Sequence, residues 1–505
     1  MKLTGNILKE SARISHQLMV KKKTTNQAQK DVLTHLLHKA KKTRIGIDFD
    51  FDKILESTPV EKAFSDALPL FSYETFYARY LNQTIAGDKN IIWPGKMPYF
   101  ALSSGTTANA SKKIPVSDHM IKQFQKTTFE QLANLYSLDL SAEFFGSSVL
   151  TIGGSTKLTK IDNHFEGDLS GILQKQKSIF FKPYSKPSKS ISKLKNWDEK
   201  VEQIIYHAPN WNIGIIAGVP TWVSMLLKAI VEHHNLSNIH EIWPNLKLYL
   251  HGGVFLDNYK EKIDVLCAHP LHYLNTFLAS EGYFAYQKAN VQDLQLLVNH
   301  GVYYEFIEKK YFDLVNTNKH ENIPTKTINE IELSKRYGLV ISTCSGLWRY
   351  IVGDVISFTD LQKFSIKIEG RISQTLTTAG EHLSLENLTE AIKRTSAELQ
   401  IPVDEFCVYP SKNNKRHHWY IGSQKVVNEN LFAVSLNKHL ESINEDYKYL
   451  RKFYLKPPKI KALPSQKFYE FLSLNDKLGG QHKFSRVMNE KQRVSWEIFL
   501  NSAFI

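Results

Sequence analysis

Apolar residues recur along the chain in two periods, one typical of helices and the other typical of strands. The first 44 residues place apolar side chains on one helical face and lysines on the other. Residues 118–136 follow the same helical period behind Ser117, a favoured capping residue. Short apolar runs predict strands at residues 97–102, 211–217 and 246–250. The chain is therefore predicted to alternate helices with buried strands.

A strand, a glycine turn and a helix follow one another at two places in the middle of the chain. The strand at 211–217 leads into a turn at 218–220 and then a helix. The strand at 246–250 ends near Gly252 and Gly253 before another helix. Alternation of this kind favours an α/β domain built on a mainly parallel sheet.

The pattern changes after Gly338, where strands become shorter. A turn-rich stretch covers residues 370–384, and short strands with helices follow it. This texture is typical of an α+β domain. We expect a large N-terminal domain over residues 1–373 and a smaller C-terminal domain over residues 374–505.

Composition narrows the function without naming it. A chain of 505 residues exceeds one compact core, and its 42% hydrophobic content excludes whole-chain disorder. The net charge of +14 suits a polyanionic ligand such as a nucleotide, nucleic acid or membrane surface. The basic runs lack regularly interleaved aromatic residues, so we expect a solvated face and no nucleic-acid partner.

Cysteine use and the N-terminus predict a cytoplasmic protein. The three cysteines are far apart and form no Cys-x-x-Cys pair, which argues against a disulfide framework or a zinc site. The first 23 residues lack the apolar run of a signal peptide. Residues 204–227 are uncharged over a membrane-spanning length, but Pro209 and Pro220 interrupt them, so we expect no membrane partner.

The strongest chemical signal is the stretch from Ser103 to Pro115, which carries hydroxyls, a glycine and two lysines. Backbone amides and hydroxyls bind phosphate oxygens, and lysine offsets their charge, so the stretch predicts a phosphate loop between a strand and a helix. It lacks the Gly-Lys-Ser/Thr ending of a Walker A loop. A flexible polar turn is the alternative. The candidate phosphate ligands are Ser103, Ser104, Gly105, Thr106, Thr107 and Lys112.

This loop resembles the phosphate loop of the auxin-responsive acyl acid amido synthetases, an acyl-adenylate-forming family with plant and bacterial branches. Five further motifs resemble that family in the same order. They are residues 243–254 with His-Gly-Gly-Val, the Ala-Ser-Glu-Gly at 279–282, the Arg-Tyr-Ile-Val-Gly-Asp-Val at 349–355, the Glu-Gly-Arg at 369–371 and the Gln-His-Lys-Phe-Ser-Arg at 481–486. The resemblance covers nearly the whole chain and implies the fold of adenylate-forming enzymes.

The resemblance implies roles that the residue types can also fill. It assigns ATP-binding positions to Gly253, Ala279 and Ser280. Glu281 follows a strand and can hold Mg²⁺, which prefers oxygen ligands, although a helix N-terminal charge is the alternative. Asp354 can accept hydrogen bonds from ribose hydroxyls, or it is a turn aspartate.

The resemblance assigns two basic residues to the reaction as well. Arg371 can pair with a ribose or phosphate oxygen, or it is a surface arginine at a domain joint. Lys483 can reach the α-phosphate when the C-terminal domain closes as a lid, or it is one of many surface lysines. Lys112 and Lys483 are the candidate catalytic residues.

Four positions depart from the family pattern. Ala108 and Asn109 replace glycines of the plant loop, which reduces backbone freedom. Leu278 stands where bacterial members commonly have a polar Asn, and His382 stands where relatives usually have a lysine.

The sequence as a whole predicts an ATP- and Mg²⁺-dependent ligase. It activates a small carboxylic acid as an acyl-adenylate and passes the acyl group to an amine, which the resemblance implies is an amino acid. Two alternatives stay open: a ligase that passes the acyl group to coenzyme A, and a degenerate nucleotide-binding protein without catalysis. A cysteine nucleophile at Cys344 is disfavoured because no base partner follows from the spacing.

Overall fold

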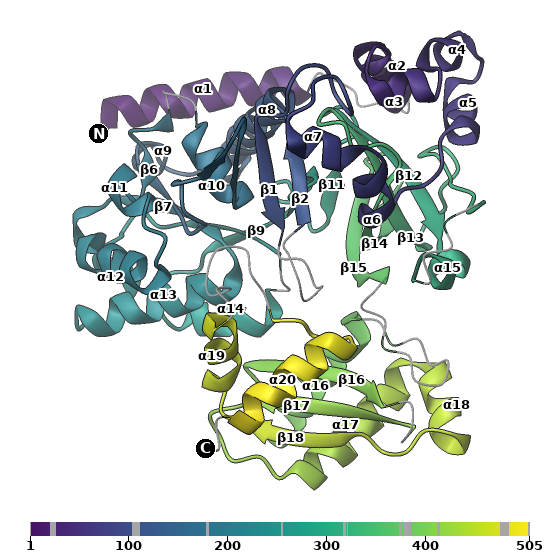
Figure 1. Ribbon diagram of the computed structural model, residues 1–505. Coiled ribbons are helices and arrows are strands. Elements are labelled where there is room, and N and C mark those ends of the chain that lie inside the picture. The colour runs from purple at the N-terminus through teal and green to yellow at the C-terminus, as the bar shows by residue number, and fades with distance from the viewer. Residues whose placement is uncertain are drawn as a thin grey trace.

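The computed structural model describes residues 2–20, 27–103, 112–177, 181–253, 256–316, 320, 322–372, 376, 383, 385–411, 415–474 and 484–502. Strands within these residues form three sheets, of eleven, four and three strands. Figure 1 shows the two larger sheets in the upper body and the smallest in a lower part that carries the C-terminal helices.

The eleven-stranded sheet has the order β12-β13-β14-β15-β11-β10-β9-β8-β7-β3-β6. Neighbours from β12 to β9 are antiparallel, and neighbours from β9 to β6 are parallel. Its strands are β3 (Ser148–Thr151), β6 (Ser185–Lys186), β7 (Ile213–Gly218), β8 (Leu248–Gly252), β9 (His272–Ala279), β10 (Gly282–Gln287), β11 (Leu294–Leu296), β12 (Val302–Glu308), β13 (Arg336–Thr343), β14 (Tyr350–Asp360) and β15 (Ser365–Arg371).

The α/β class is confirmed, but the sheet is mixed and not mainly parallel as expected. Parallel neighbours need a crossover of a dozen or more residues, whereas antiparallel neighbours can be joined by a short turn. Only Ser280 and Glu281 separate β9 from β10, so this pair is antiparallel. A strand that is buried on both faces, such as β13, has a continuous apolar run whether its neighbours are parallel or antiparallel. The apolar pattern therefore does not predict strand direction.

The four-stranded sheet has the order β2-β1-β5-β4, with strands β1 (Tyr99–Ser103), β2 (Lys112–Val116), β4 (Thr159–Ile161) and β5 (His164–Gly167). Strands β1 and β2 are antiparallel, with Ser103 opposite Lys112. The expected phosphate loop therefore joins two strands. The prediction that it joins a strand directly to a helix is wrong, because helix α8 begins only at Asp118.

Helices cover the two larger sheets. They are α1 (Lys2–Val20), α2 (Gln27–Ala40), α3 (Arg44–Asp48), α4 (Phe51–Glu56), α5 (Val60–Ala67), α6 (Tyr73–Phe76), α7 (Asn82–Ala86), α8 (Asp118–Asn134), α9 (Ala142–Phe145), α10 (Leu169–Lys175), α11 (Lys189–Ser192), α12 (Trp197–His207), α13 (Pro220–His233), α14 (Asp257–Asp264) and α15 (Phe312–Asn316). Ser117 caps α8 as predicted, because its hydroxyl accepts a hydrogen bond from the Met120 amide.

The C-terminal region has an α+β composition, as expected. Strand β17 pairs antiparallel with β16 and parallel with β18. Its elements are α16 (Leu385–Leu399), β16 (Glu405–Ser411), β17 (Arg416–Gly422), α17 (Glu429–Ile443), α18 (Glu445–Phe453), β18 (Lys459–Leu463), α19 (Gln466–Leu474) and α20 (Glu490–Ser502). Phe406, Trp419 and Leu436 belong to a separate hydrophobic cluster within it. Another cluster joins Phe468 and Trp496 to Trp222 of α13, so the region also packs on the body.

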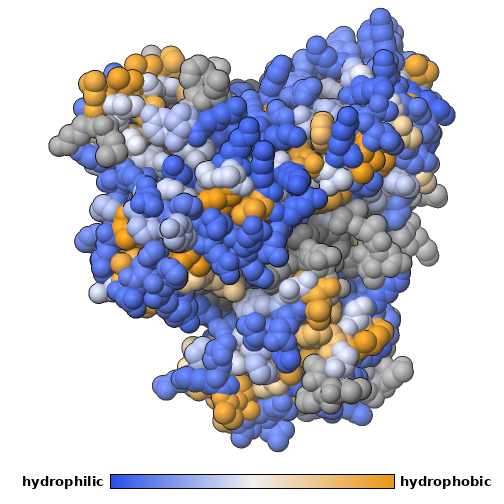
Figure 2. Space-filling view, turned by 60° about the vertical axis from the view of Figure 1, so that its left-hand side comes forward, coloured by the Kyte–Doolittle hydropathy of each residue, from blue (hydrophilic) through white to orange (hydrophobic). Residues whose placement is uncertain are grey.

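The surface is mainly polar on the face drawn in Figure 2, where hydrophobic residues lie in small separate groups. Among the residues described, no helix combines the length and apolar character needed to cross a membrane.

Candidate active site

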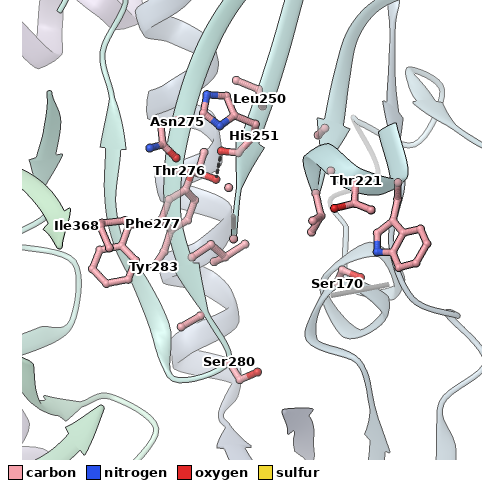
Figure 3. A pocket seen from close by; sticks show the side chains of 18 of the residues that line it. Ser170, Thr221, Leu250, His251, Asn275, Thr276, Phe277, Ser280, Tyr283 and Ile368 are labelled. Atoms are coloured by element: carbon pink, nitrogen blue, oxygen red, sulfur yellow. Dashed lines mark hydrogen bonds between the residues drawn. The ribbon is translucent and has the colours of Figure 1, made fainter. Parts of the chain in front are cut away.

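A cavity of about 1380 Å³ lies where strand ends of the body meet the C-terminal region. Its walls include the ends of β1, β2, β8, β9, β14 and β15, together with residues of β16 and α19. Figure 3 shows Thr221 and Ser170 across an open space from Thr276 and Phe277. The cavity thus has walls supplied by elements far apart in the sequence.

The structure brings together all the predicted site residues that it describes. These residues line the cavity and are Ser103, Lys112, Gly253, Ala279, Ser280, Glu281, Asp354 and Arg371. The remaining predicted residues, Ser104, Gly105, Thr106, Thr107 and Lys483, lie outside the described residues, as do Ala108, Asn109 and His382.

The first two strands of the smaller upper sheet position one wall. Ser103 ends β1 and Lys112 begins β2, so the segment between them starts and finishes at the cavity. The Lys112 ammonium lies 3.8 Å from Glu74 and 5.0 Å from the centre of the Tyr73 ring. Lys113 instead pairs with the Glu166 carboxylate at 2.5 Å. Adjacent lysines therefore divide into one at the cavity and one held by a partner within the sheet.

Glycines shape the turn that follows β8. Gly253 has φ +88°, a left-handed conformation that favours glycine. A Cβ on Gly252 would lie 2.5 Å from the Thr276 carbonyl oxygen, so β8 and β9 can approach only with glycine there. The neighbouring strand β9 ends at Ala279, and Ser280 and Glu281 form the turn to β10. Two turns at adjacent strand ends therefore face one cavity.

Glu281 lies in the turn between β9 and β10, and not at a helix N-terminus. Burial raises the pKa of its carboxyl, whereas the charge of Arg371 lowers it and that of Asp354 raises it. The carboxyl is therefore a desolvated oxygen donor among charged groups. A cation placed beside it would favour its ionised form.

These donors fit a magnesium ion that arrives with a nucleotide. Within the described residues, no group of three or more His, Cys, Asp or Glu side chains is placed to hold a metal. Mg²⁺ is commonly held by one or two carboxylates, with phosphate oxygens and water completing its shell. The single carboxylate of Glu281 suits that arrangement.

Asp354 and Arg371 face each other across β14 and β15. The Arg371 Nε donates to Asp354 Oδ1 at 2.8 Å, and the two side chains are 41% and 11% exposed. Asp354 lies within β14, so the alternative of a turn aspartate is wrong. The pair presents a carboxylate and a guanidinium together at the cavity.

The C-terminal region contributes to the cavity wall a buried polar cluster that the sequence did not predict. The Arg486 guanidinium pairs with the Glu405 carboxylate at 2.6 Å. Tyr259 of α14 donates its hydroxyl to Glu405 Oε1 at 3.1 Å. Burial raises the pKa of Tyr259, so this hydroxyl keeps its proton and stays a donor. Lys262 of the same helix pairs with Asp404. Helix α14 therefore binds the C-terminal region directly.

The fold and the cavity define an α/β protein with its site at strand ends, next to a smaller α+β region. Comparison with protein-family models matches the GH3 family N-terminal domain at residues 14–160 and 147–271, the GH3 family central domain at 295–371 and the GH3 family C-terminal domain at 386–492. The chain belongs to the GH3 family. The family predicted from the sequence is confirmed.

Solved structures show the same fold at low identity. A structure titled GH3.15 acyl acid amido synthetase has 16% identity and a TM-score of 0.75, covering 94% of this chain and 93% of that one. A 2-hydroxyisobutyryl-CoA ligase in the postadenylation state, in complex with 2-HIB-AMP, has 10% identity and a TM-score of 0.62, covering 95% and 91%. A comparison with curated protein sequences finds no match.

Proposed function

We propose that this chain activates a small carboxylic acid with ATP and transfers the acyl group to an amine, namely an amino acid. One observation carries the proposal: eight predicted site residues from five separate sequence segments line one cavity. Membership of the GH3 family and the likeness to an acyl acid amido synthetase and a CoA ligase support it.

The reaction has two steps that the cavity can accommodate in turn. The acid's carboxylate attacks the α-phosphorus of ATP, pyrophosphate leaves, and an acyl-adenylate forms. The amine then attacks the acyl carbon, AMP leaves, and an amide forms. Holding the reactants in line supplies about 7 to 11 kcal/mol of the barrier lowering in well-oriented systems. The cavity walls therefore act chiefly by alignment.

The charged wall residues that the sequence predicts have roles in the first step. Lys112 and the loop from Ser103 to Thr107 bind phosphate oxygens. Asp354 accepts hydrogen bonds from the ribose hydroxyls, and Arg371 holds a ribose or phosphate oxygen. Glu281 holds Mg²⁺, which offsets the charge of the phosphates.

The adenylate must be kept from water, and the second domain serves that need. We assign residues 1–373 to binding of ATP and acid and residues 374–505 to a mobile lid. Lys483 reaches the α-phosphate on closure, so it contributes mainly to the transition state. Gly253, Ala279 and Ser280 belong to the ATP-binding wall of the cavity.

We place the protein in the cytoplasm, without nucleic-acid or membrane partners. Its three cysteines are free, and Cys344 and Cys407 are buried. Burial raises the pKa of the Cys344 thiol to about 12, which disfavours it as a nucleophile.

The test is ATP–pyrophosphate exchange across a library of carboxylic acids, followed by product analysis with an amino-acid pool or coenzyme A. We expect exchange with a limited set of acids and an amide product. A thioester product would move the chain to the CoA-ligase class. Bound ATP without exchange for any acid would contradict catalysis and identify a nucleotide-binding protein.

A further inference from the structure

One lysine in the cavity wall has no role in the proposed adenylation. Lys177 follows helix α10 and lines the cavity with Gln174 and Ser185. Its ammonium donates to the Ser185 hydroxyl at 2.8 Å. Within the described residues, no carboxylate forms an ion pair with it. Its side chain is partly buried, and this burial lowers its pKa to about 8.

Other cations of the same wall already have carboxylate partners. Arg371 pairs with Asp354, Arg486 with Glu405, Lys260 with Asp264 and Lys112 with Glu74. Lys367 also lines the cavity, but its side chain is exposed to solvent. Lys177 is therefore the desolvated cation of the described wall that lacks an anion. A desolvated charge is costly unless a partner offsets it.

The segment that carries Lys177 is held in place by its neighbours. Gln125 of α8 donates to the Gln176 carbonyl at 2.6 Å, and Gln176 donates to the Tyr99 hydroxyl at 2.5 Å. Tyr99 begins β1, whereas Ser103 at the phosphate loop ends it, roughly 13 Å further along the strand. The backbone beside the lysine is thus held by Tyr99, which lies at the end of β1 opposite Ser103.

The Ser185 hydroxyl strengthens this arrangement. It donates to the Phe181 carbonyl at 2.8 Å while it accepts from Lys177, so its orientation is set. An ammonium has three donors, and this bond uses one of them. Two N–H groups remain for a ligand. A carboxylate has two oxygens that can accept both.

We propose that Lys177 binds a substrate carboxylate that is not activated: the carboxylate that an amino-acid acceptor retains while its amine attacks, or a second carboxylate of the acid. This inference rests on the proposed function and assigns a specificity residue to it. The cation discriminates for substrates with a second anionic end, because a neutral end would leave Lys177 desolvated and without an anion.

The experiment compares wild type with Lys177→Met, which removes the charge but keeps much of the stem. Lys177→Arg keeps the charge, and Lys367→Met is the matched control for an exposed lysine of the same wall. Each protein is assayed for pyrophosphate exchange with mono- and dicarboxylic acids. Each is also assayed for amide formation with an amino acid and with the primary amine that lacks its carboxylate.

We expect Lys177→Met to raise the KM for the amino acid by about tenfold to a hundredfold and to leave the KM for the decarboxylated amine unchanged. A loss of pyrophosphate exchange that is confined to dicarboxylic acids would show that Lys177 binds the second carboxylate of the acid. Lys177→Arg should retain most of the preference, and Lys367→Met should match wild type.

Equal kinetics of Lys177→Met and wild type with every substrate would overturn the inference, and so would equal losses with carboxylated and decarboxylated acceptors. If Lys177→Met does not fold, the substrate preference of wild type decides the matter. Wild type that prefers neither the amino acid over the decarboxylated amine nor dicarboxylic over monocarboxylic acids would refute the subsite. Absence of exchange in wild type would overturn the proposed function and this inference with it.

Discussion

Two arginine–carboxylate pairs near the large sheet have similar distances and opposite surroundings. Arg349 Nη2 lies 2.9 Å from Glu305 Oε1, and these side chains are 5% and 3% exposed. Arg371 Nε lies 2.8 Å from Asp354 Oδ1, and these side chains are 41% and 11% exposed. Both arginines belong to sequence motifs that resemble the family. Distance alone does not separate them.

The number of protein acceptors does separate them. Arg349 also donates to the carbonyls of Ser65 and Leu68 and to the Thr325 hydroxyl. Its guanidinium is therefore enclosed and holds the N-terminal helices to the sheet. The Arg371 contacts within the described residues are with Asp354, at the cavity. A motif arginine is therefore structural where the protein encloses it and available to ligands where one side stays open.

The largest effect is expected from Arg349→Met. Breaking a buried pair leaves Glu305 as an uncompensated charge, which costs about 3 to 5 kcal/mol of unfolding free energy. Urea unfolding followed by circular dichroism measures it. Arg371→Met is the matched control and should lose much less stability. A loss below about 1 kcal/mol for Arg349→Met would contradict the structural role.

Arg371→Met, which should lose little stability, should have a large effect in the activity assay. Loss of one oriented charge at the phosphates or ribose should lower pyrophosphate exchange by about a hundredfold, which corresponds to about 3 kcal/mol. Unfolding by urea should change little, because the guanidinium is partly exposed. A folded variant with normal exchange would remove Arg371 from the site.

Asp354→Asn should have a smaller and more selective effect. It weakens acceptance of the ribose hydroxyls, so the KM for ATP should rise by about tenfold. Steady-state kinetics with ATP and with 2′,3′-dideoxy-ATP provide the measurement. Wild type should discriminate between these nucleotides, and the variant should discriminate less. Unchanged discrimination would show that Asp354 serves only to orient Arg371.

The smallest effect is expected from Lys262→Met. This lysine pairs with Asp404 across the two regions, but its side chain is 40% exposed. Exposed pairs contribute about 0.2 to 1 kcal/mol, so the midpoint of unfolding should shift only slightly. A thermal melt against wild type measures the shift. A loss of several kcal/mol of unfolding free energy would contradict the expectation that a more exposed ion pair contributes less stability than a buried one.

Local features of the fold could be predicted from the sequence. The helix behind Ser117 and the strand near residues 246–250 appear as α8 and β8, because periodicity and capping are written in contiguous residues. Strand direction could not be predicted, since it depends on pairing between distant strands. The β1–β2 hairpin was likewise missed, because β2 is a short strand between a loop and a helix.

The candidate site shows the same division. Gly253, Ser280, Glu281 and Asp354 lie in short motifs, so their shared cavity could be expected. Glu305 is 44 residues from Arg349, and the sequence around neither residue predicts that the two form a pair. Lys177 gives no signal in the sequence, because its importance comes from desolvation by elements that fold around it. Partners set by tertiary packing need the structure.

The turn at Gly253 and the hydroxyl of Tyr259 belong to neighbouring parts of one turn-and-helix unit, which has a thermodynamic consequence. Gly253 lines the cavity, where we propose that the nucleotide binds, while Tyr259 binds Glu405 of the C-terminal region. If nucleotide binding shifts helix α14, it changes the free energy of domain docking, and docking changes nucleotide affinity by the same factor. Nucleotide occupancy of the cavity and docking of the C-terminal region would then be coupled through one short helix.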